Sequence, residues 1–132
     1  MTYLLDANTC INYLNGRSEP IRRQIESLRP DNLALCSVVK AELLYGAAKS
    51  GRSAENVAKL RRFFARFASL PFDDAAAEVY GRIRARLERA GSPIGPNDLL
   101  IAAIALAHQR TLVTHNQDEF GRIEELDLED WE

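Results

Sequence analysis

The sequence is poor in the residues that build metal–thiolate sites and disulfide frameworks. Its 132 residues include two cysteines, Cys10 and Cys36, and two histidines, His108 and His115. Both cysteines stand among apolar residues, so we expect buried free thiols. Neither histidine has a second histidine at ligand spacing, which argues against a zinc site.

Long apolar runs and several well-known chemical motifs are also missing. No stretch approaches the roughly 20 apolar residues of a membrane-spanning helix. The start, MTYLLD, has no basic segment ahead of an apolar run, so it gives no indication of a signal peptide. The motifs GxxxxGK[ST], GxGxxG and GxSxG are absent. We therefore expect a cytoplasmic protein without a membrane partner.

What is present is the composition of a folded domain. Hydrophobic residues make up 46% of the chain, and the length suits one domain over residues 1–132. The formal net charge of −2 gives no indication of nucleic-acid binding. Arginines nevertheless gather in residues 61–66 and 82–89. Such segments are either solvated helix faces or a rim that contacts phosphate.

Short apolar runs alternate with segments of helical periodicity. This alternation predicts an α/β fold, with a mainly parallel central sheet and helices on both faces. We expect Ser37 to cap one helix, and we expect another helix to extend over 54–67. The expected strands are residues 2–5, Asn32–Cys36 and Thr111–Thr114, with Leu126–Trp131 as a final edge strand or plug.

Four acidic residues stand at the ends of these elements or inside apolar segments. They are Asp6, Glu42, Asp98 and either Glu119 or Asp118. Parallel topology brings such positions to one edge of the sheet. Carboxylates gathered there raise each other's pKa, and a hard divalent cation relieves that conflict. A site of this kind can activate water for hydrolysis of a phosphate ester.

Each acid also has a plain structural explanation. Asp6 and Asp98 could be helix caps, and Glu42 could face solvent on its helix. Glu119 and Asp118 could be surface acids of a turn. The hypothesis of a site therefore depends on the whole set of acids.

The motifs together resemble those of PIN-domain ribonucleases of the VapC type, the toxins of type II (VapBC) toxin–antitoxin pairs. The resemblance covers essentially the whole chain. It rests on LLDAN at 4–8, SVVKAELLYGA at 37–47, IGPNDLLIAAIA at 94–105, TLVTHNQDEFGRI at 111–123 and LDLEDW at 126–131.

The resemblance implies a three-layer α/β/α sandwich and Mg²⁺- or Mn²⁺-dependent endoribonuclease activity. By position, Asp6, Glu42 and Asp98 match the family's metal-binding carboxylates. Many PIN domains have a fourth acid where this chain has Asn116. In a similar subfamily with the pattern N-x-x-E-F the acid comes later, which points to Glu119, while Asp118 stays open.

Two further residues match supporting positions of the family. Asn8 matches the asparagine that supports the first acid, and Thr114 matches the hydroxyl at the end of the fourth strand. Asn116 is expected to act beside them, without touching the metal directly.

The resemblance also implies partners. We expect a homodimer, inhibition by a VapB-type antitoxin that covers the active site, and operator DNA bound only through the antitoxin. RNA is the expected substrate, with the anticodon loop of initiator tRNA as the candidate.

Two other functions stay open at this point. One is a non-catalytic PIN scaffold that acts through antitoxin binding and control of its own operon. The other makes Asp6 a covalent phosphoryl acceptor. Phosphatases of that kind need a second acid two residues further on, where this chain has Asn8.

Overall fold

A computed structural model describes residues 1–132. Five parallel strands form one sheet in the order β3-β2-β1-β4-β5. The strands are β1 (Tyr3–Leu5), β2 (Leu33–Cys36), β3 (Ala68–Leu70), β4 (Thr111–Val113) and β5 (Leu128–Glu129).

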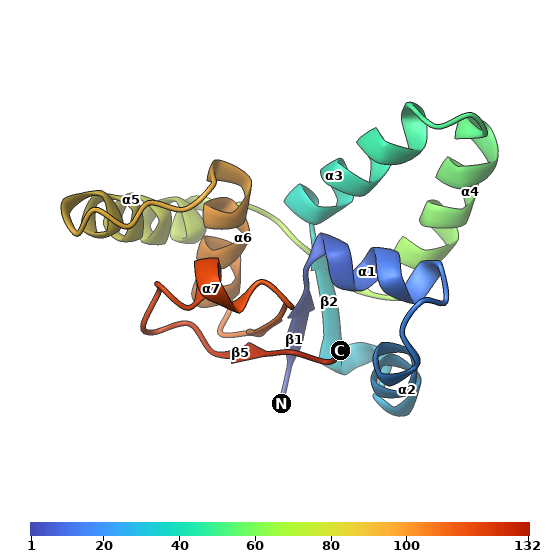
Figure 1. The fold of residues 1–132 in the computed structure, drawn as a ribbon, viewed down its shortest axis with the longest axis horizontal. Helices are drawn as coiled ribbons and strands as arrows, with labels where there is room; N and C mark the ends of the chain where they lie inside the picture. The colour runs from blue at the N-terminus through green and yellow to red at the C-terminus, as the bar shows by residue number, and fades with distance from the viewer.

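Seven α-helices flank this sheet. They are α1 (Ala7–Leu14), α2 (Glu19–Ser27), α3 (Ser37–Ala48), α4 (Ser53–Phe64), α5 (Asp74–Arg89), α6 (Pro96–Ala107) and α7 (Gln117–Phe120), with a 3₁₀ turn η1 at Pro30–Asn32. Figure 1 shows α1 to α4 on one side of the sheet and α5 to α7 on the other. The predicted α/β/α sandwich with a parallel central sheet is therefore confirmed.

The order of the strands creates a switch point between β1 and β4. The chain moves outward from β1 through β2 to β3, and then crosses back to place β4 on the other side of β1. Ligands of open parallel sheets bind beside the carboxyl ends of the strands at such a point. Asp6 lies there, because its backbone N–H donates to the Val113 carbonyl at 3.1 Å.

Most helix ends follow from local sequence, and two differ from expectation. The Asp73 carboxylate caps α5 by accepting from the Ala76 N–H at 2.9 Å. Ser37, however, is the first residue of α3 and not its cap, because the chain turns into the helix directly after Cys36. Its hydroxyl donates instead to the Leu70 carbonyl at 3.5 Å.

The second difference is at the end of α4. That helix ends at Phe64, three residues before the predicted end at Phe67. Phe67 is buried all the same, because its ring packs edge-to-face on Phe63. The aromatic spacing predicted the burial of Phe67 correctly, but Phe67 lies in the residues that follow the helix.

The core explains why α6 lacks a polar face. Six of its residues are buried between the sheet and α5, as expected for a helix that is apolar all round. Cys10 and Cys36 are buried free thiols, and burial raises the pKa of both. None of the helices combines the length and apolarity needed to cross a bilayer.

Candidate active site

Asp6 occupies the bend where β1 passes into α1. Its Oδ1 accepts a hydrogen bond from the Thr9 N–H at 2.8 Å, so Asp6 is the N-cap of α1. It is 6% exposed and lines a cavity at the carboxyl edge of the sheet. Capping engages Oδ1 alone, so the cap explanation and the site hypothesis hold together.

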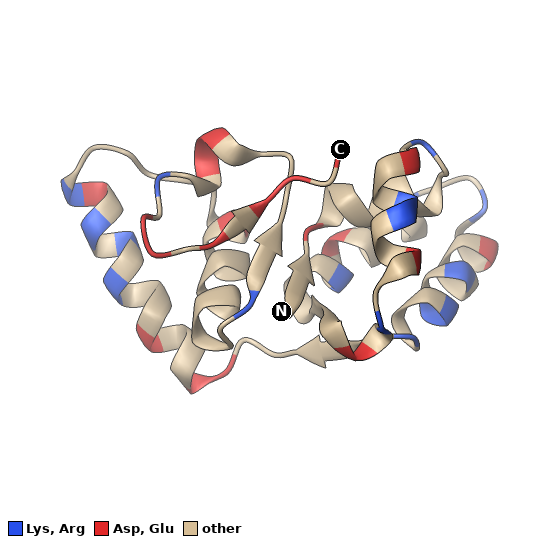
Figure 2. Ribbon diagram, turned by 90° about the horizontal axis from the view of Figure 1, so that it is seen from below, with Lys and Arg blue, Asp and Glu red and all other residues tan.

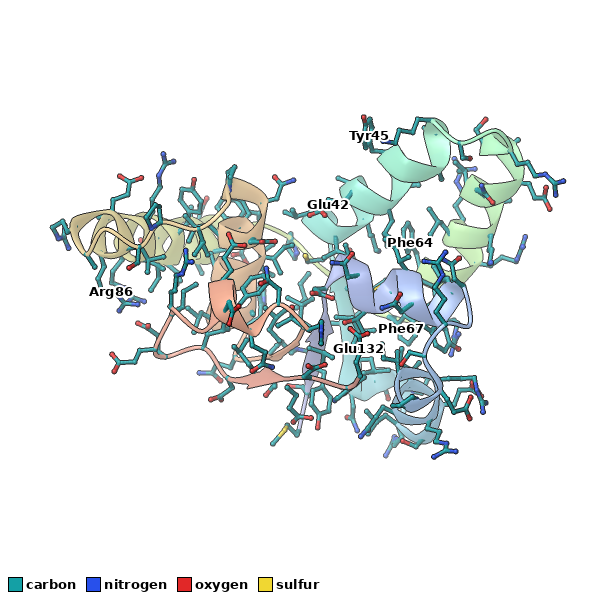
Figure 3. All side chains as sticks on the ribbon, viewed as in Figure 1. Glu42, Tyr45, Phe64, Phe67, Arg86 and Glu132 are labelled. Atoms are coloured by element: carbon teal, nitrogen blue, oxygen red, sulfur yellow. The ribbon has the colours of Figure 1, made fainter.

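Glu42 reaches the same cavity from α3. Figure 3 shows it on the first half of α3, above the start of α1. Its Oε1 is buried and has no hydrogen-bond partner in the chain. Burial raises the pKa of Glu42, and the negative charge of Asp6 adds to that rise. Glu42 is therefore no solvent-facing helix residue, and it has an oxygen ready to bind a ligand.

Asp98 lies in the first turn of α6, where the helix dipole favours a negative charge. Burial nevertheless raises its pKa to about 6, helped by the charge of Glu119 and a hydrogen bond with it, and by the charges of Glu42 and Asp6. The other three acids thus all act on Asp98, as the hypothesis of a shared site requires.

Glu119 is held in place on α7 by two donors. Its carboxylate accepts from the Gly95 N–H and from Asn116 Nδ2, the latter at 3.1 Å. The Gly95 hydrogen bond is the main reason that the pKa of Glu119 is lowered. Asp118 is exposed on the same helix. Of the two open candidates, the geometry favours Glu119 as the acid beside Asp98.

The cavity between these side chains has a volume of about 90 Å³. Its lining comes from four helices and the turns that follow β1 and β4, namely Asp6, Ala7, Asn8, Glu42, Asp98, Ile101, Asn116 and Phe120. The volume suits an ion with a few waters more than a nucleobase. The elements that carry the acids are far apart in sequence, and the topology of the sheet brings them together.

The supporting residues are arranged partly as expected. The buried Thr114 accepts the Asn116 N–H at 3.0 Å and so fixes the turn that leads to Glu119. Asn8 lines the cavity, but it is exposed and the hydrogen bond to Asp6 comes from Thr9.

Sequence reasoning missed Thr9 and Gly95. Thr9 is buried, and its hydroxyl donates to the Val113 carbonyl at 3.4 Å, which ties α1 to β4. Its position three residues after an N-cap was the available signal. Gly95 acts through its backbone N–H, so no side-chain pattern could have indicated it.

The donor set of the cavity fits a hard divalent cation. Its acids are oxygen ligands, and the unpartnered Glu42 Oε1 is the kind of atom that such an ion would engage. The tightest cluster of candidate ligand atoms lies elsewhere, at His115, Asp130 and Glu132, within 4.8 Å of one another. That cluster is exposed, and the bond to Asp130 raises the pKa of His115. His115 Nδ1 is already engaged by Asp130 at 2.8 Å, so the cavity is the better candidate.

Comparisons with known proteins find the same family and fold for this α/β/α domain. The PIN domain model matches residues 3–126. The chain is 41% identical to Ribonuclease VapC2 of Rickettsia felis, over 100% of this chain and 99% of that protein. It is 38% identical to the tRNA(fMet)-specific endonuclease VapC of Salmonella typhimurium, over 99% of this chain and 98% of that protein.

Solved structures agree with these matches. The crystal structure of VapBC2 from Rickettsia felis, bound to a DNA fragment from its promoter, aligns with a TM-score of 0.92 at 41% identity and covers 100% of both chains. The chain therefore belongs to the PIN-domain family. The resemblance to the VapC type, drawn from the sequence motifs, is confirmed.

Proposed function

We propose that this chain is a metal-dependent endoribonuclease, the toxin of a VapBC-type toxin–antitoxin pair, acting as one domain over residues 1–132. The observation that carries the proposal is the meeting of Asp6, Glu42 and Asp98 around one cavity, with Glu119 beside Asp98. Relatives named as ribonuclease and tRNA(fMet)-specific endonuclease support the reaction class.

Asp6, Glu42, Asp98 and Glu119 would hold Mg²⁺, or Mn²⁺ in its place. When bound, the ion supplies activation of a water molecule and stabilisation of the charge that develops on the phosphate. The chain's own residues fix the geometry of the cavity. Asp6 is immobilised by its cap to α1, and Thr114 and Asn116 keep Glu119 turned towards Asp98.

The candidate RNA is initiator tRNA, because the Salmonella relative is named for it. We also propose a homodimer, and inhibition by a VapB-type antitoxin whose chain covers the cavity. The promoter DNA in the Rickettsia VapBC2 complex supports operator binding by such a complex. We assign operator contact to the antitoxin, as the resemblance to VapBC pairs implies.

The test compares purified wild type with Asp6→Ala and Asp118→Asn on initiator tRNA, with and without Mg²⁺. We expect cleavage that needs Mg²⁺, persists in Asp118→Asn and is lost in Asp6→Ala. Circular dichroism checks that Asp6→Ala remains folded, since it also loses a helix cap worth about 1 kcal/mol.

Three results would contradict the proposal. Cleavage at the wild-type rate by a folded Asp6→Ala protein would show that the cavity is not the active site. A phosphorylated Asp6 recovered after incubation with a phosphate ester would favour phosphoryl transfer over RNA hydrolysis. If calorimetry detected no divalent-ion binding while antitoxin binding was intact, the chain would be a non-catalytic scaffold.

A further inference from the structure

The two basic segments of the chain differ in how their charges are compensated. On α5 three of the four arginines are paired with acids. Arg82 and Arg86 both contact Glu125, at 3.2 and 2.6 Å, and Arg84 contacts Glu88 at 2.9 Å. Bringing a phosphate to any of these three guanidinium groups means replacing a carboxylate that is already there.

The segment around α4 has almost no such compensation. Residues 49–66 contain six basic residues and one acid, a formal net charge of +5. The single ion pair of the segment joins Arg52 to Glu55 at 3.9 Å. Lys59, Arg61 and Arg62 are exposed and have no carboxylate within ion-pair distance. We call these three residues the α4 basic surface. Figure 2 shows basic positions along both helices, with acidic ones interspersed on α5.

A groove connects the α4 basic surface with the acidic cavity. It has a volume of about 330 Å³, lies between α1, α3 and α4, and has Glu42 among its lining residues. Glu42 also lines the acidic cavity, so its side chain borders both spaces. On α4 the groove is bordered by Asn56 and Lys59, and Lys59 Nζ donates to the Leu14 carbonyl at 3.2 Å.

Whether the basic side chains of a helix are already paired with carboxylates decides whether that helix can bind a polyanion. An exposed ion pair is worth little in isolation, yet a paired arginine has no free charge to offer a phosphate. When an unpaired cation neutralises a phosphate, the counterions condensed on the nucleic acid are released, and this release drives binding. For this reason α4 attracts an RNA backbone and α5 is close to neutral towards it.

We propose that the α4 basic surface binds the phosphates of the RNA next to the cleavage site, and that the strand reaches the acids through the groove beside Lys59. This inference rests on the proposed function, because the bound polymer is the substrate of that site. In this proposal α4 contacts the substrate, whereas the paired arginines of α5 have a structural role.

The experiment compares two triple variants that remove equal charge. One is Lys59→Gln/Arg61→Gln/Arg62→Gln on α4, and the other is Arg82→Gln/Arg84→Gln/Arg86→Gln on α5. Both are made in an Asp98→Asn background, which blocks cleavage, and binding of fluorescein-labelled initiator tRNA is measured by anisotropy from low to moderate salt. Melting temperatures and light scattering report the fold and the oligomeric state.

We expect the α4 triple variant to bind at least about tenfold more weakly. The slope of log K against log salt should fall by about 2, near 0.7 for each single-strand phosphate that the variant no longer neutralises. The α5 triple variant should stay within about threefold of its parent. Equal weakening by both triples would mean that general charge, and not the α4 basic surface, holds the RNA, and would overturn the inference.

Other outcomes separate this inference from the proposed function. If wild type cleaves RNA and the α4 triple variant binds normally, the inference fails and the nuclease proposal stands. If the α4 triple variant keeps its affinity for RNA but changes its oligomeric state, the surface is an interface between copies of the chain and the inference is wrong. If wild type neither binds nor cleaves RNA, the proposed function fails and the inference falls with it.

Discussion

Asp98 and Glu119 are neighbouring acids whose pKa values shift in opposite directions, upward for Asp98 and downward for Glu119. Glu119 keeps its charge because the Gly95 N–H and Asn116 Nδ2 both donate to it. Asp98 is more deeply buried and receives no comparable donor, so its pKa rises to about 6. The acid in the first turn of α6 is thus costly to ionise until a cation is present.

The pair predicts how the metal-free fold responds to pH. A carboxyl whose pKa rises from 3.8 to about 6 on folding binds more protons in the folded state between these values. Stability therefore falls as pH rises through this range. Asp98→Asn should remove much of this fall and raise the melting temperature at pH 7.5 in the presence of a chelator. Melting curves from pH 4 to 8 measure it, with Asp118→Asn as the control. A lower melting temperature for Asp98→Asn would contradict the assignment.

Cation binding should follow the same proton. A divalent ion that uses Asp98 must displace its proton, so affinity should rise as pH rises through about 6. We expect Mn²⁺ to raise the melting temperature clearly at pH 7.5 and only weakly at pH 5. The Asp98→Asn variant should show a small shift at both values. An Mn²⁺ effect of equal size at pH 5 and pH 7.5 in wild type would place the ion away from Asp98.

Glu119 and Asp118 are adjacent acids that the structure allows to be separated. Glu119→Gln removes a charge from the pair with Asp98, whereas Asp118→Asn changes an exposed side chain. We expect Glu119→Gln to lower RNA cleavage and Mn²⁺ affinity by about 10- to 100-fold, as is usual when a residue that orients or binds a metal is lost. Asp118→Asn should stay within about twofold in both assays. The reverse order of effects would assign the fourth acid to Asp118.

The layers, the parallel sheet and the candidate site residues Asp6, Glu42 and Asp98 could be predicted, because they follow from the spacing of apolar and acidic residues in the sequence. Apolar periodicity locates strands and helices, and parallel topology gathers their carboxyl ends. The hydrogen bond from Gly95 to Glu119 could not be predicted, because every residue except proline has a backbone N–H. The support of Asp6 was assigned to Asn8, whereas the chain bends so that Thr9 provides it. The choice between neighbouring acids on α7 likewise depended on helix phase, which a four-residue helix does not reveal in sequence.

We expect Thr114 to affect RNA cleavage only by positioning the turn that carries Glu119. Its hydroxyl is buried and accepts the Asn116 N–H at 3.0 Å, at the start of the turn that carries Glu119. Thr114→Val keeps the shape but removes the acceptor, so we expect cleavage to fall by about tenfold or more. Stability should fall by about 1–3 kcal/mol, because a partly buried N–H loses its partner. Thr114→Ser should restore most of the activity; if it does not, packing of the methyl group and not the hydroxyl is responsible.

Trp131 connects the last strand to the first and, through it, to the active site. The indole is 5% exposed, packs edge-to-face on Tyr3 at 5.1 Å, and donates to Glu129 Oε1 at 3.0 Å. The Glu129 carbonyl in turn accepts the Thr114 N–H at 2.9 Å. Trp131→Ala should cost about 3–5 kcal/mol of stability, the usual loss for a buried tryptophan.

Chemical denaturation measures this loss, and Glu132→Ala is the matched control because its side chain lies at the surface. We expect Trp131→Ala to lose cleavage on warming at a lower temperature than wild type, and to retain it in the cold, where the fold persists. The acids keep their positions while β4 remains folded, so cleavage should be lost at the temperature at which the protein unfolds. A Trp131→Ala protein that is fully folded yet inactive would mean that the indole contributes to the active site itself.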